Sequence, residues 1–116
     1  MDPRLEKALE FSNYHKILTT QKETLKEKTI KNMLIGYNGG MFRVDRNLMC
    51  FVKMMIDSNR KTDIPILDLN DNPILIEDLE DFWEVLITNY LKNMNEYYLG
   101  YKKIKEQRSA EKMLEI

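Results

Sequence analysis

His15 and Cys50 are the only histidine and the only cysteine of the chain, so they are the first candidates for catalysis or metal binding. Nucleophilic catalysis needs a base beside the nucleophile, and nothing in the sequence pairs His15 with a partner. A zinc site needs several Cys or His ligands at short spacing, whereas these two residues lie far apart in the chain. We interpret His15 as a surface or interface residue and Cys50 as a core or interface thiol. We expect no catalytic residue, no metal site, no cofactor and no enzymatic activity.

Two stretches are rich in oxygen ligands. Residues 68–72 lack the central glycine and the final glutamate of a calcium loop, and Asp and Asn are typical turn residues. The second stretch contains the acidic residues Glu77, Asp78, Glu80, Asp81 and Glu84. On a helix these positions spread around the axis, which predicts a solvated first turn that compensates the helix dipole. An enzyme of unfamiliar type would instead need a pocket in which Asp68, Asp71 or His15 lies beside other polar groups.

Length and composition set the class of protein. The chain has 116 residues, 43% of them hydrophobic and 32% charged, which predicts a single domain over residues 1–116. Eighteen basic residues against nineteen acidic ones make nucleic acid an unlikely partner, since no net field attracts it. No apolar run approaches the roughly 20 residues that cross a bilayer, and no secretory signal is visible. We therefore expect no membrane association and a cytoplasmic location.

The hydrophobic periodicity and the turn residues predict an α+β fold that is mostly helical. Long N- and C-terminal helices and one shorter middle helix accompany a small antiparallel β-hairpin or a three-stranded sheet. The glycines after residue 35 end the first helix, Asp45 caps the second, and Asp78 or Glu77 caps the third. A third strand around Phe42 is expected because two strands alone are marginal in water. The predicted elements are a helix over 3–35, a strand over 41–44, a helix over 46–58, a hairpin over 64–76 and a helix over 78–108.

Each long helix carries an apolar stripe at close to heptad spacing, and the stripe of the last helix is aromatic. Helices of this length exceed what a compact core of this size needs, so we predict a homodimer in which the long helices pair. Two alternatives stay open: the helices cover each other within one chain, or the stripe residues belong to the core, which for Trp83 is the better interpretation. The interface candidates are Phe11, Tyr14, Leu18, Trp83, Tyr90, Tyr97 and Tyr101.

The last helix also combines tyrosines with basic residues. Tyr97, Tyr98 and Tyr101 lie beside a basic tail that consists of Lys102, Lys103, Lys105, Arg108 and Lys112. Aromatic rings and lysines together can stack on and neutralise single-stranded nucleic acid. A single-stranded nucleic-acid-binding accessory factor is therefore the alternative function.

Four stretches of the chain are distinctive when taken together: Tyr37-Asn38-Gly39-Gly40-Met41-Phe42, the segment 67–74, the run Ile76-Glu77-Asp78-Leu79-Glu80-Asp81-Phe82, and residues 107–112. Together they resemble small uncharacterised proteins of contractile-tailed bacteriophages of marine cyanobacteria. The resemblance implies a viral or marine origin, with the host cytoplasm as location, and it transfers no active site. We expect a non-catalytic accessory or interaction protein whose long helices and hairpin bind a protein partner.

Overall fold

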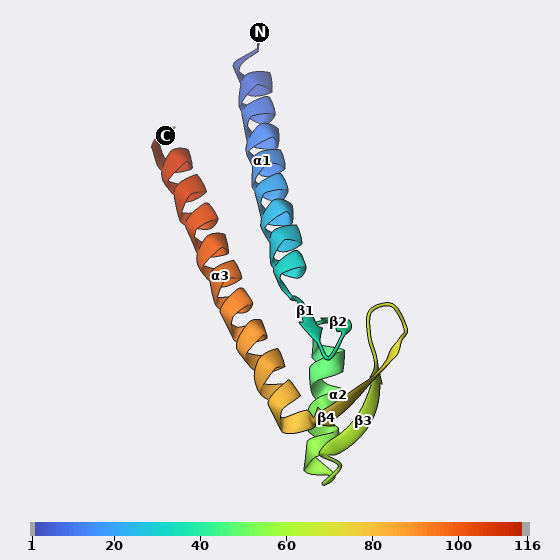
Figure 1. Ribbon diagram of the computed structural model, residues 1–116. Helices are drawn as coiled ribbons and strands as arrows, with labels where there is room; N and C mark the ends of the chain where they lie inside the picture. The colour runs from blue at the N-terminus through green and yellow to red at the C-terminus, as the bar shows by residue number, and fades with distance from the viewer. Residues whose placement is uncertain (1, 115–116) are drawn as a thin grey trace. The chain divides into compact units, whose positions relative to one another are not determined.

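The computed structural model describes residues 2–114, with side chains described as far as Gln107 (Figure 1). The side chains of Arg108 and Lys112 in the predicted basic tail therefore lie outside the described residues. Long helices at both ends and a shorter middle helix confirm the predicted α+β, mostly helical fold. The elements of the described chain are α1 (Pro3–Asn32), β1 (Leu34–Tyr37), β2 (Gly40–Arg43), α2 (Arg46–Asp57), β3 (Thr62–Leu67), β4 (Pro73–Asp78) and α3 (Leu79–Leu114).

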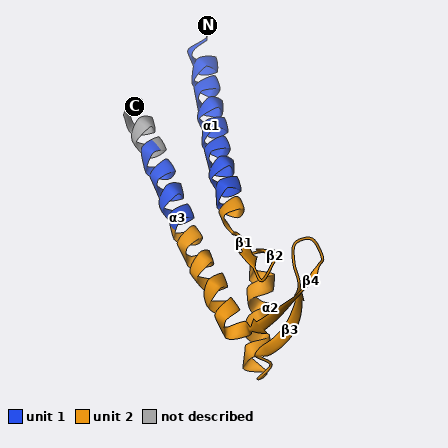
Figure 2. Cartoon of the chain, in the orientation of Figure 1, with its two compact units in different colours: residues 1–29, 96–116 blue, residues 30–95 orange. Residues whose placement is uncertain are grey.

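The chain divides into two compact units (Figure 2). Unit 1 consists of residues 1–29 and 96–116, and unit 2 consists of residues 30–95. Helices α1 and α3 each contribute to both units. The single domain over residues 1–116 stays a prediction.

A hairpin follows α1 where the sequence predicted the end of a helix. The chain leaves α1 after Asn32, and β1 pairs antiparallel with β2, so the prediction of helix up to residue 35 is wrong. Asn38 and Gly39 form the turn with φ values of 49° and 83°, both in the left-handed region that a tight two-residue hairpin requires. The apolar run 33–35 fits helix and strand equally well, which is why its type depends on this turn.

The two hairpins form separate two-stranded sheets, so no three-stranded sheet is present in the described chain. In the second hairpin, Ile64 pairs with Ile76 and Ile66 pairs with Ile74. Ile66 and Ile76 are buried, so this face of the β3–β4 hairpin lies on the core of unit 2.

The core of unit 2 is built around Phe82 of α3. Its ring lies 5.0 Å from the ring of Phe42 on β2 and 4.8 Å from that of Tyr37 on β1, measured between centroids. Rings at these distances and angles stabilise a core beyond their burial alone. The other buried apolar residues of the core are Met33, Val44, Met49, Val52, Ile66, Ile76, Leu79 and Leu86.

Capping side chains fix where α2 and α3 begin and where α1 ends. The Asp45 carboxylate accepts a hydrogen bond from Leu48 N, and that of Asp78 accepts from Glu80 N and Asp81 N, as the sequence predicted. The end of α1 is held differently. Buried Asn93 donates from Nδ2 to the Asn32 carbonyl at 3.1 Å, which satisfies one of the carbonyls that a helix end leaves open.

The carboxylate of Asp68 joins the two hairpins. Its Oδ1 accepts hydrogen bonds from Asn70 N at 2.9 Å and Asn72 N at 2.8 Å, which shapes the β3–β4 loop. Its Oδ2 accepts from Met41 N on β2 at 3.2 Å. The hydrogen bond from Asn72 N has the largest effect on the pKa of Asp68. Together with the bonds from Met41 N and Asn70 N it lowers this pKa below its usual 3.8, although desolvation of the carboxylate opposes them. Asp68 is thus a structural carboxylate whose ionised form the fold prefers.

We predict that Asp68→Asn lowers the urea midpoint of unfolding, because an amide nitrogen then faces backbone donors. A group whose pKa is lowered in the folded state stabilises the fold above its unfolded pKa, near 3.8, and this contribution is lost as the pH falls through the lower folded value. The difference between wild type and variant should therefore shrink below about pH 4. Asp71→Asn in the same loop is the control, and equal midpoints for all three proteins would contradict the role of Asp68.

A second prediction concerns Tyr37, whose hydroxyl donates to Oδ2 of Asp81 at 2.7 Å. Burial, and then this hydrogen bond, raise the pKa of Tyr37 to about 12 from 10.0. Because the folded pKa is the higher one, the stabilisation is complete below pH 10 and is lost as the pH rises towards 12. Tyr37→Phe should cost about 0.5–1.5 kcal/mol of unfolding free energy at neutral pH.

Spectrophotometric titration of the tyrosines checks the pKa of Tyr37, since Tyr37→Phe should remove the component that ionises near pH 12. Asp81→Asn keeps an acceptor but removes the charge, so it should shift this component towards lower pH. If the component that Tyr37→Phe removes ionises near the usual pKa of 10.0 instead, the phenol is not held as described.

Candidate interaction surfaces

The outward face of the β3–β4 hairpin is apolar. We define the hairpin face as Pro65, Leu67, Pro73 and Leu75, which the register brings together as the cross-strand pairs Pro65–Leu75 and Leu67–Pro73. Leu67 is 61% exposed and Leu75 is 48% exposed. A hairpin with one face on a core normally presents polar residues on the other. This hairpin therefore exposes a second apolar face to solvent.

Two further exposed apolar residues lie where the β3–β4 loop meets β2. Leu69 follows β3 and is 47% exposed, and its backbone N–H donates to the carbonyl of Met41 at 2.7 Å. Met41 lies on the exposed side of β2. The described part of unit 2 thus places four large, exposed apolar side chains on β2, β3, β4 and the loop between the last two.

The charged residues in the strands and loop of the β3–β4 hairpin are all acidic, and the basic residues Arg60 and Lys61 directly precede β3. Residues 62–78 contain five carboxylates and no lysine, arginine or histidine. Asp63 and Glu77 lie at one end of the face, between the pairs Thr62–Asp78 and Ile64–Ile76, and Asp71 lies in the loop at the other end. All three are exposed. The hairpin therefore combines an apolar centre with an acidic border.

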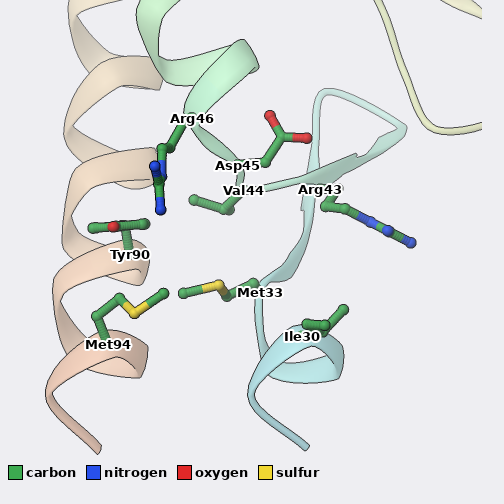
Figure 3. A pocket seen from close by; sticks show the side chains of 8 residues that line it. All are labelled: Ile30, Met33, Arg43, Val44, Asp45, Arg46, Tyr90 and Met94. Carbon is green, nitrogen blue, oxygen red and sulfur yellow. The ribbon is translucent and has the colours of Figure 1, made fainter. Parts of the chain in front are cut away.

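A cavity of about 330 Å³ lies elsewhere in unit 2 (Figure 3). Met33, Val44, Tyr90 and Met94 supply most of its apolar wall, and Figure 3 shows the Arg46 side chain extending towards Tyr90 while Asp45 points away. The cavity can accept a small apolar group beside a guanidinium. Its full lining is Ile30, Met33, Arg43, Val44, Asp45, Arg46, Tyr90 and Met94.

The predicted interface residues on α1 lie along the side of the helix that faces α3 within unit 1. Tyr14 and Leu18 are half-buried, whereas Phe11 is 55% exposed and packs edge-on against His15, with 4.4 Å between ring centroids. Further along, Leu25 packs onto Gly100, where a Cβ atom would come within 3.0 Å of its methyl carbons. Within unit 1, α1 therefore packs on α3 of the same chain, which is the alternative to helix pairing in a dimer that the sequence left open.

The predicted aromatic residues of α3 lie in different surroundings. Trp83 and Tyr90 are partly buried and pack against the core of unit 2, so for Trp83 the core interpretation describes its position. Tyr97 and Tyr101 are half-buried in unit 1. The ammonium of Lys22 lies over the ring of Tyr101, 5.1 Å from its centroid, and occupies one face of that ring.

Another apolar ridge of α1 lies away from the stripe that faces α3. Leu5, Leu9 and Ile17 are exposed, and their spacing follows the i, i+4 rows of a helix. At about 100° per residue, Leu9 lies roughly half a turn around the axis from Leu18. This α1 ridge, defined by Leu5, Leu9 and Ile17, is uncovered in the described structure.

The remaining candidates for chemistry are dispersed. Cys50 is exposed on α2, so the core half of its interpretation as a core or interface thiol is wrong, because the buried residues of α2 are Met49 and Val52. The interface half stays a prediction. His15 belongs to unit 1, whereas Asp68 and Asp71 belong to unit 2. Within the described residues, no cluster of three or more Asp, Glu, His or Cys side chains has a metal-binding arrangement. None of the described helices is long and apolar enough to span a membrane.

Comparison with known proteins gives no relative for these surfaces. No protein-family model, curated protein or solved structure matches the chain. The sequence analysis named the hairpin as part of a binding surface but not the residues of its outward face, and it singled out neither the α1 ridge nor Asn93. The hairpin face had a signal, since both residues of each cross-strand pair are apolar, whereas nothing in the sequence marks Asn93.

Proposed function

We propose that the protein is a non-catalytic accessory protein that works by binding other proteins, one of them a second copy of itself. The hairpin face is the observation that carries this proposal. Soluble monomers rarely leave a contiguous apolar surface of this kind uncovered, and such surfaces are characteristic of binding sites. A phage origin and a cytoplasmic location are parts of the same proposal that come from the sequence resemblance.

The second copy is proposed to bind through the α1 ridge. Its i, i+4 spacing lets the ridge of one helix enter the groove of an identical helix, and a twofold axis makes such a surface self-complementary. Leu5 and Leu9 are 53% and 48% exposed, so each has apolar area left to bury. This assigns the long helices of the predicted homodimer a specific contact.

We predict that sedimentation equilibrium at micromolar concentration gives twice the chain mass of 13.9 kDa. The double variant Leu5→Gln and Leu9→Gln should weaken the dimer about tenfold or more, because apolar area at its centre is replaced by amide groups. Glutamine retains the helix, so circular dichroism should stay unchanged.

The matched control is Met54→Gln on α2, an exposed residue that belongs to unit 2. A strict monomer for the unaltered chain would refute the homodimer. A dimer that persists in the Leu5 and Leu9 variant would place its interface elsewhere.

The alternative function, binding of single-stranded nucleic acid, has one observation in its favour. Tyr98 is 61% exposed, and Lys102 and Lys105 follow it on α3. A ring in this setting is available for stacking on a base. Binding of an oligonucleotide at low salt that Tyr98→Ala abolishes would support this alternative, and no binding at low salt would remove it.

A further inference from the structure

We infer that the partner of the hairpin face is a cationic amphipathic segment of another protein, which sets apolar side chains on Leu67 and Leu75 and basic side chains on the surrounding carboxylates. This inference rests on the proposed function, because it names the class of protein that the hairpin face binds.

The apolar centre determines how the partner docks. Pro65 and Pro73 lack a backbone N–H, so each strand of the hairpin is one donor short at positions where an added strand would pair. The leucines, in contrast, project from the face of the sheet. Docking onto this face, rather than extension of the sheet at an edge, is the arrangement that buries them.

The charges determine which partner docks. Asp63 and Glu77 at one end and Asp71 at the other carry the same sign, and residues 62–78 contain no basic residue to neutralise them. Among the described residues, the salt bridge next to the hairpin joins Lys61 to Glu80 and involves none of these three carboxylates. Lysine or arginine residues that flank an apolar stripe would complement this border.

The same charges disfavour the other occupants. A second hairpin face placed on the first would bring Asp63 and Glu77 of both copies into one interface, where like charges repel. An anionic membrane surface would meet the same repulsion, although the exposed leucines alone would suit a lipid bilayer. Charge complementarity thus selects a basic protein segment among the apolar partners.

Two synthetic helical peptides test the inference on the full-length protein. One carries leucine at positions i, i+3, i+4 and i+7 and lysine at the others, so that the two residue types occupy opposite faces of the helix, and the other has glutamate in place of lysine. Titration calorimetry should show binding of the lysine peptide that weakens as salt is added, and no binding of the glutamate peptide.

Variants separate this site from general attraction between charges. Leu67→Ser with Leu75→Ser, and separately Asp63→Asn with Glu77→Gln, should each weaken binding of the lysine peptide about tenfold. The matched control is Leu91→Ser with Leu99→Ser, two comparably exposed leucines of α3, which should bind as the unaltered protein does. Circular dichroism verifies that each variant is folded.

The contrary outcomes distinguish this inference from the proposed function. If the glutamate peptide binds equally well and needs Leu67 and Leu75, the hairpin face binds protein but the cationic class is wrong. If the lysine peptide binds the Leu67→Ser, Leu75→Ser variant as tightly as the unaltered protein, the hairpin face is not the site. If the leucine variant no longer forms the dimer, the occupant of the hairpin face is a second copy of the chain. If the protein binds phosphatidylserine vesicles and this binding needs Leu67 and Leu75, the occupant is a lipid surface.

Discussion

The junction between the two hairpins of unit 2 depends on a buried carboxylate. Two-stranded sheets are marginal by themselves, and the two hairpins share no strand pairing, so core packing and polar contacts have to hold them together. Asp68 supplies the central polar contact by accepting backbone hydrogen bonds from its own loop and from Met41 on the other hairpin. The main-chain bond from Leu69 N to Met41 O reinforces the same junction. The position of the hairpin face relative to β2 follows from these contacts.

Local chemistry made much of the fold predictable. Asp45 and Asp78 cap the helices that the sequence assigned to them, and the polar run before Pro73 turns the second hairpin. A cap or a tight turn depends on a few adjacent residues, so its signal survives in the sequence alone. The first hairpin was missed although Asn38-Gly39 carries the usual signal for a tight turn, because the preceding apolar run also continues the helical pattern.

Features that depend on distant partners were not predictable in the same way. Asn93 satisfies a carbonyl at the end of α1 that lies far away in the sequence, and no local pattern indicates such a pairing. The exposure of Cys50 was not predictable from the sequence either, because the side of α2 that faces the core depends on which hairpins pack on it. At the hairpin face, an uninterrupted apolar run fits a strand buried on both sides equally well. Only the structure shows that one side of this run is uncovered.

The division of the chain into units also bears on the order in which it folds. Unit 2 is one continuous stretch of sequence, whereas unit 1 combines two segments that unit 2 separates. Contacts between residues close in sequence cost less chain entropy to form than contacts that close a long loop. The hairpins and α2 are therefore expected to assemble first and to bring the two segments of unit 1 within reach. During synthesis the first of these segments has to wait, with its leucines uncovered, until the second has been made.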